Sequence, residues 1–115
     1  MSSAVARQAR AWYLQRISAM VLALCVVVHI GVIIYAVRGG LSGAEILGRT
    51  RGNWGFGLFY TIFVLACAVH VPIGVANIAE EWLGWSSRRA RALFFVAGLL
   101  ILLLGLRAVV GVTLR

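Results

Sequence analysis

Charged residues are scarce in this sequence, and their scarcity argues against a water-soluble fold. Only 12% of the 115 residues are charged and 63% are hydrophobic, whereas a soluble domain carries roughly 25% charged residues. The chain also lacks a nucleophile–base pair, a phosphate-binding glycine loop and a thiolate metal motif. We therefore predict no catalytic residue in this chain.

The two cysteines do not indicate a disulfide scaffold. Cys25 and Cys67 both lie inside apolar stretches, whereas small secreted proteins place their disulfide cysteines in loop-rich folds. We expect two buried free thiols that pack as small hydrophobic side chains.

Three long apolar stretches dominate what the sequence does contain: Ile17 to Val37, Phe56 to Ala79 and Ala92 to Leu114. Each is close to the ~20 residues that a helix needs to cross ~30 Å of hydrocarbon. The first stretch begins too late, is too long and lacks a small-residue cleavage site, so we interpret it as a permanent helix and not as a signal peptide.

These stretches predict an all-α membrane protein with three transmembrane helices in up-down-up order. We predict one transmembrane domain over residues 1–115, with helices at about 14–37, 56–80 and 90–113. The glycine-rich segment between the first two helices contains a few apolar residues, so we expect a short interfacial helix within residues 41–53.

All eleven basic residues are arginine, and the net charge is +8. Most lie at helix ends, so lipid is the expected partner and nucleic acid is not. Six arginines lie in the N-terminal segment and the second interhelical loop, against four on the opposite face. Because positively charged segments stay in the cytoplasm, we expect a cytoplasmic N-terminus.

Three helices are too few to line a transport pathway by themselves. We therefore expect a partner chain or an oligomer.

His29 and His70 are the two histidines of the chain, and both lie well inside hydrocarbon depth. Ionisable residues are costly there and indicate function, although a carbonyl of a neighbouring helix can also satisfy a histidine. Imidazole is a common axial ligand of haem iron, and coordination relieves the cost of burying it. Gly74, one turn after His70, leaves space for a flat macrocycle or, equally, for close helix packing. We predict haem b, with both histidines as iron ligands.

The two histidines are not expected at the same height. If the first helix is centred near Val27 and the second near Ala68, antiparallel packing displaces His29 toward the outside and His70 toward the cytoplasm, by roughly 6 Å in total. Two ligands of one upright haem should be nearly level. The difference favours two haems, each completed by a histidine of another chain, over one haem held by this chain alone.

Polar and aromatic side chains gather at the cytoplasmic entrance of the first helix, and four are candidates for quinone binding: Trp12, Gln15, Arg16 and Ser18. They offer hydrogen bonds to the carbonyl oxygens of a quinone whose tail lies in lipid. An arginine–aromatic anchor at the interface explains the same composition. Arg107, near the outer end of the third helix, either extends to the headgroups or pairs with a haem propionate near His29.

Two short motifs resemble the three-helix cytochrome b membrane anchors of succinate dehydrogenase and fumarate reductase. Gln15-Arg16-Ile17-Ser18 is similar to the His-Arg-x-Ser-Gly of their first helix, and His70-Val71-Pro72-Ile73-Gly74 is similar to the His-x-x-x-Gly of their second. The resemblance covers nearly the whole chain. It implies that His70 is a haem ligand and that Arg16 and Ser18 lie near a ubiquinone or menaquinone pocket.

The chain departs from this family pattern at several positions. Trp12 stands where the family usually has a serine, Ala76-Asn77 replaces an Arg-His pair, and Glu81 replaces an aspartate. His29 is not typical of single-haem members. It resembles the first-helix ligand of di-haem members, which also place a glutamine about four turns earlier, as Gln15 is here.

The resemblance implies a non-catalytic, haem b-binding anchor subunit of a succinate:quinone oxidoreductase in a bacterial inner membrane. A second small anchor subunit would help to hold one or two haems, while an iron–sulfur subunit and a flavoprotein would carry the succinate or fumarate chemistry. Two alternatives remain open. One is a haem-free membrane scaffold, and the other is a subunit of a small oligomeric transporter whose histidines relay protons.

Overall fold

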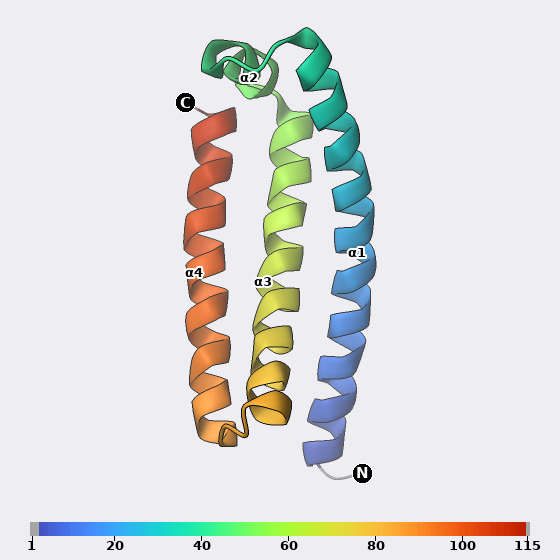
Figure 1. Ribbon diagram of the computed structural model, residues 1–115, viewed down its shortest axis with the longest axis vertical. Coiled ribbons are helices and arrows are strands. Elements are labelled where there is room, and N and C mark those ends of the chain that lie inside the picture. The colour runs from blue at the N-terminus through green and yellow to red at the C-terminus, as the bar shows by residue number, and fades with distance from the viewer. Residues whose placement is uncertain (1–2, 115) are drawn as a thin grey trace.

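The computed structural model describes residues 3–114, and four helices account for most of them. Helices α1 (Ser3–Gly39), α3 (Trp54–Trp82) and α4 (Ser87–Thr113) run up, down and up, with α3 between the other two. Helix α2 (Gly43–Thr50) crosses one end of this bundle (Figure 1). The three long helices are each long and apolar enough to cross a membrane. The predicted all-α, three-helix membrane fold is confirmed.

Helix α1 begins well before the predicted span at residues 14–37. At 1.5 Å per residue its 37 residues extend about 55 Å, far more than the ~30 Å of a bilayer core. The apolar pattern marks only the part that can cross a membrane, whereas alanine, arginine and glutamine in the first turns are good helix formers and extend the helix. Trp12 therefore lies inside α1 and not at its end.

A short helix, α2, lies between the first two long ones. Ser42 caps its start, because the Glu45 N–H donates to the Ser42 hydroxyl oxygen at 3.1 Å. The Ser42 hydroxyl in turn donates to a Glu45 carboxylate oxygen at 2.8 Å. Together these two bonds resemble a Ser-x-x-Glu capping box, which fixes where the helix begins.

The other end of α2 is tied to the end of α4. The Thr50 hydroxyl donates to the Val112 carbonyl oxygen at 2.6 Å, and the Gly52 N–H donates to the Thr113 carbonyl oxygen at 2.7 Å. The last carbonyl groups of a helix have no partner within it. These two bonds satisfy them and hold α2 over the bundle.

Helices α3 and α4 pack closely because glycines of α4 face α3 at two heights. A Cβ atom on Gly98 would lie 3.3 Å from Pro72 Cγ, and one on Gly105 would lie 2.6 Å from Val64 Cγ1. Pro72 is fully buried at this contact, and α3 continues through it to Trp82. Small residues allow helix backbones to approach one another in lipid, where the hydrophobic effect does not drive helices together.

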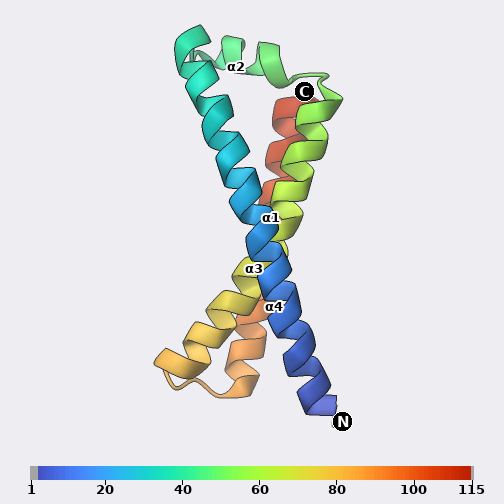
Figure 2. The ribbon, with the colours of Figure 1, turned by 90° about the vertical axis from the view of Figure 1, so that its right-hand side faces the viewer.

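Helix α1 crosses α3 and diverges from it toward both ends (Figure 2). The side chains buried near the crossing are small: Ser18 and Cys25 on α1 and Ala66 on α3. Both cysteines are free thiols, as predicted, although Cys67 is only half-buried. Large apolar side chains along the long helices remain exposed, and in a membrane protein lipid or a neighbouring chain covers such a surface.

Replacing Gly105 with leucine is expected to separate α4 from α3, because the new side chain would overlap Val64. Overpacking of this kind costs about 1–3 kcal/mol. The free energy of unfolding in detergent, followed by circular dichroism during titration with sodium dodecyl sulfate, should fall by that amount. Gly111→Leu is the control, since nothing lies within 4 Å of its Cβ position. Equal stability of the two variants would contradict the described packing.

Candidate functional site

His70 on α3 faces α1, where the Ser18 hydroxyl lies beside its ring. Its Nδ1 atom lies 3.4 Å from the hydroxyl oxygen of Ser18, a residue that is 6% exposed. The Ser18 hydroxyl donates to the Gln15 carbonyl oxygen at 3.1 Å. A Cβ atom on Gly74 would lie 3.4 Å from Gln15 Nε2. We term these four residues, Gln15, Ser18, His70 and Gly74, the His70 cluster.

The Ser18 hydroxyl lies between two partners, the Gln15 carbonyl oxygen and Nδ1 of His70. When its single proton goes to the Gln15 carbonyl oxygen, the hydroxyl can only accept a hydrogen bond from His70. This arrangement requires a proton on Nδ1, and Nε2 is the ring nitrogen that Ser18 does not contact. A neutral imidazole held through one nitrogen and free at the other is the form that binds metal ions.

Gly74 and Gln15 meet where α1 and α3 pack. The missing side chain of Gly74 leaves space that the Gln15 amide fills. The amide oxygen of Gln15 is buried and has no hydrogen-bond partner in the described part of the chain, residues 3–114. Of the two roles open to Gly74, this geometry supports close helix packing.

His29 on α1 lies near the end of the bundle that α2 covers. Its ring stands edge-on to two rings of α3, those of Tyr60 and Phe63, with centroid distances of 6.0 and 5.8 Å and interplanar angles of 85° and 87°. Two cavities of about 360 and 190 Å³ reach this imidazole, and Ile46 and Thr50 of α2 line both. We term them the His29 cavities.

The contacts between α1 and α3 give the heights of the two histidines. Ser18 lies beside His70, and His29 lies beside Tyr60 and Phe63. At 1.5 Å per residue, the interval from Ser18 to His29 along α1 is roughly 16 Å, and the interval from His70 to the two rings along α3 is roughly 10–15 Å. Two imidazoles this far apart along the bundle cannot bind one iron atom.

The predicted order of the two heights is right, but the predicted separation of roughly 6 Å is too small. That value assumed that the centres of the two spans are level. Helix α1 continues to Gly39, and α2 precedes the start of α3, so α1 extends past that start (Figure 1). Val27 consequently lies nearer the height of Phe63 than that of Ala68.

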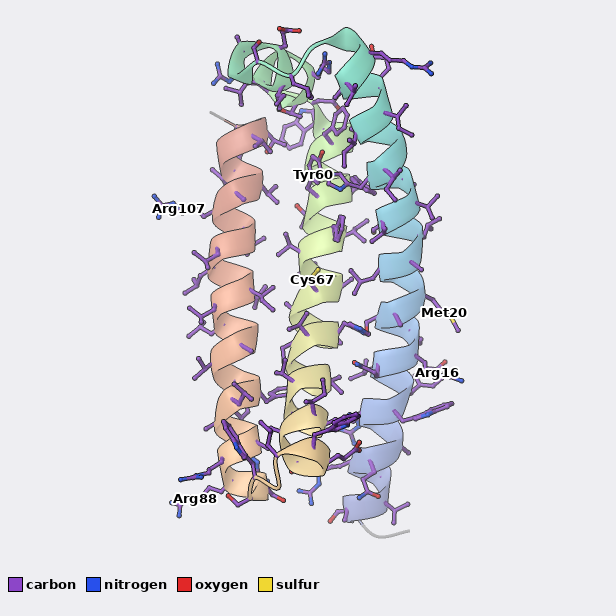
Figure 3. The ribbon with its side chains drawn as sticks, in the orientation of Figure 1. Arg16, Met20, Tyr60, Cys67, Arg88 and Arg107 are labelled. Atoms are coloured by element: carbon purple, nitrogen blue, oxygen red, sulfur yellow. The ribbon has the colours of Figure 1, made fainter. Side chains whose placement is uncertain are left out.

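The four candidate quinone residues occupy two faces of α1. Gln15 and Ser18 face α3, whereas Trp12 and Arg16 are exposed. The guanidinium carbon of Arg16 lies 5.2 Å from the Trp12 ring centroid, a cation–π contact. Figure 3 shows Arg16 pointing away from α3. The structure therefore brings two of the four residues to His70 and presents the other two outward.

Arg107 points away from the bundle on the outer side of α4 (Figure 3). It follows Gly105, which contacts Val64, so it lies close to the height of His29 but on another side of the molecule. Sequence analysis missed a second cation at this height, Arg49 of α2, which lines the smaller His29 cavity. The capping motif that begins at Ser42 could have drawn attention to Arg49. It predicts a short helix, and Arg49 lies in the second turn of that helix.

Neither histidine belongs to a cluster of metal-binding side chains. Among residues 3–114, no group of three or more His, Cys, Asp or Glu side chains is placed to hold a metal ion by itself. Each imidazole is thus a single potential ligand with its own surroundings: a serine hydroxyl for His70, and aromatic rings with two cavities for His29.

A comparison with known families identifies the type of protein that has this geometry. The family described as succinate dehydrogenase/fumarate reductase transmembrane subunit matches residues 4–106. The chain belongs to this family. Comparisons with curated proteins and with solved structures give no match. The protein is therefore a multi-pass membrane anchor subunit of a succinate dehydrogenase or fumarate reductase complex, in agreement with the resemblance of its His70 motif.

Both histidines of this transmembrane subunit lie inside the matched region, as do the four residues at the entrance of α1. Arg107 lies just beyond it. The whole His70 cluster and the smaller His29 cavity therefore lie within the matched region, whereas the larger His29 cavity also has lining residues beyond it.

Replacing Ser18 with alanine is expected to weaken the preference of His70 for the Nδ1-protonated form. A hydrogen bond of this kind contributes about 0.5–1.5 kcal/mol, so the ratio of the two tautomers should fall roughly two- to tenfold. Nitrogen NMR of the histidine-labelled subunit in detergent measures this ratio, and His29 in the same spectrum is the internal reference. Ser18→Thr keeps a hydroxyl and should resemble the wild type. An unchanged ratio in Ser18→Ala would refute the tautomer assignment.

Proposed function

We propose that this anchor subunit binds haem b through His29 and His70 and contributes to the quinone site of a succinate:quinone oxidoreductase. The observation that carries the proposal is the position of the two imidazoles. Each lies within a helix that can cross the membrane, at a height of its own, in a family of respiratory transmembrane subunits.

The residues around each histidine fit a haem. Ser18 orients the His70 ring and leaves Nε2 for iron. The larger His29 cavity is lined by the small residues Gly105 and Ala108 as well as by Tyr60 and Phe63, a surface suited to a flat apolar macrocycle. When bound, haem supplies one-electron transfer, while this chain holds and orients the imidazoles.

Two haems agree with the heights of the histidines better than one. Because His29 and His70 lie on different levels, each would hold a haem of its own. A second small anchor subunit would supply a further ligand at each level. A version with one haem, ligated by His70, leaves His29 without a role.

The quinone site is proposed at the end of the bundle that holds the start of α1. Arg16 and Trp12 present a cation and an indole N–H there, and Ser18 and Gln15 lie on the neighbouring face of the helix. Such groups suit the carbonyl oxygens of ubiquinone or menaquinone. Electrons would pass between this site and the iron–sulfur subunit, with haem nearby.

We infer that this end of the bundle faces the cytoplasm of a bacterial cell. The arginines of the N-terminal segment and of the loop between α3 and α4 favour this orientation in the inner membrane. The iron–sulfur subunit would dock on this face and carry the flavoprotein, which holds the succinate or fumarate chemistry.

Haem content tests the ligand assignment. The intact complex is expected to contain two low-spin haems b, and His29→Ala and His70→Ala are each expected to lose one, because each removes one axial ligand. Pyridine haemochrome assays and visible spectra of the purified complexes measure this. Added imidazole should restore part of the lost spectrum in His29→Gly and His70→Gly. A wild-type complex without haem bands would leave only a tethering role, and full haem in His29→Ala would leave only the single-haem version.

Quinone kinetics test the proposed role of Arg16. Arg16→Gln is expected to raise the KM for a short-chain quinone roughly tenfold, since a hydrogen bond to a charged group contributes about 1.5–3 kcal/mol. Haem content should stay unchanged. Arg10→Gln removes the same charge from the same helix farther from the cluster and serves as the control. If both variants have the wild-type KM, Arg16 is an interface anchor and not a quinone contact.

A further inference from the structure

Arg49 brings a positive charge to the smaller of the two His29 cavities. Its side chain lines the smaller cavity together with His29, although the two residues come from different helices. Its Nη1 atom is buried and has no hydrogen-bond partner among residues 3–114. A guanidinium has five N–H donors, and leaving a charged donor buried and unpaired is costly. The position therefore favours an acceptor that the described residues do not supply.

The guanidinium of Arg49 is held in place from the side of α1. Its central carbon lies 5.6 Å from the ring centroid of Tyr35, a cation–π contact. A Cβ atom on Gly39 would lie only 2.8 Å from Arg49 Nη2, so the absence of a side chain there allows the close approach. The aromatic face and the glycine fix the orientation of the charge before any ligand arrives, which reduces the entropy lost on binding.

Among residues 3–114, no carboxylate oxygen is a hydrogen-bond partner of Arg49 Nη1. The sequence has three acidic residues, and two of them, Glu80 and Glu81, lie at the far end of α3. The third, Glu45, precedes Arg49 by one turn of α2; its carboxylate accepts a hydrogen bond from Ser42 and packs against Gly40. The site at His29 thus combines one imidazole, mostly apolar walls and a guanidinium nitrogen without a partner among the described residues.

We propose that Arg49 binds a carboxylate of the ligand held at His29, namely a propionate of the haem. A planar guanidinium matches a carboxylate with two parallel hydrogen bonds. Haem carries its carboxylates on one edge, and Arg49 lies on α2, which crosses the end of the bundle. The inference rests on the proposed haem ligation by His29. It assigns to Arg49 the role that the sequence suggested for Arg107, which points away.

The test compares Arg49→Gln with Arg107→Gln in the intact complex. Both variants remove one arginine charge at a similar height, but only Arg49 faces the cavity. The spectral bands that are lost in His29→Ala belong to the haem at His29, and these bands are followed in the other variants. In Arg49→Gln this haem should pass to excess apomyoglobin roughly tenfold faster, as expected when a charge-assisted hydrogen bond is lost. Its midpoint potential should also fall, because an unpaired propionate favours ferric iron.

Two further variants keep the test interpretable. Arg49→Lys retains a charge without the planar fork and should lie between the wild type and Arg49→Gln. Gly39→Ala leaves Arg49 in the sequence but displaces its guanidinium, and should change the potential in the same direction. Arg107→Gln should match the wild type in both measurements.

The outcomes separate this inference from the proposed function. If His29→Ala loses one haem but Arg49→Gln behaves like Arg107→Gln, the role of Arg49 is wrong and the haem ligand stands. If His29→Ala keeps all haem, the ligand assignment is wrong and the inference falls with it. A phospholipid headgroup is the other anion that could bind Arg49, and phosphorus analysis of the purified complex measures bound phospholipid. Loss of phospholipid from Arg49→Gln, without a change in the haem, would assign Arg49 to a lipid headgroup and refute the proposal.

Discussion

Hydrocarbon offers no hydrogen bonds, and this constraint governs how the anchor subunit is built. Its backbone polar groups are paired inside long helices, and hydroxyls such as those of Thr61 and Thr113 donate back to carbonyl oxygens one turn earlier. Where α4 ends, Thr50 and Gly52 satisfy its last carbonyls. Two side chains remain with buried polar atoms that have no partner among residues 3–114, those of Gln15 and Arg49. Each lies beside one of the two histidines.

Much of this architecture follows from the sequence, because membrane-crossing helices are marked by length and hydrophobicity alone. The positions of His29 and His70 within those helices were equally predictable. The register between α1 and α3 was not, since it depends on where α1 ends beyond the membrane and on the room that α2 takes. An error of a few residues in that register changed the height difference of the histidines from roughly 6 Å to more than roughly 10 Å.

The division of the α1 entrance into two faces was implicit in the helical period. Trp12 and Arg16 are one turn apart, as are Gln15 and Ser18, and the two pairs point in different directions. Their residue types suggested one quinone-binding group, whereas the structure places the four residues on two faces of α1. Arg49 escaped notice for another reason: its significance depends on a cavity lined by residues of α1, α2 and α3, and no short motif predicts such a cavity. Ser18 gained a role for the same reason, because its partner His70 is 52 residues away in the sequence.

The bonds from Thr50 and Gly52 to the end of α4 have a consequence for the surroundings of His29. They hold Ile46 and Thr50 of α2 beside side chains of the three long helices, so all four helices line the larger His29 cavity. A change in this short helix would therefore alter the walls around an imidazole that belongs to another helix.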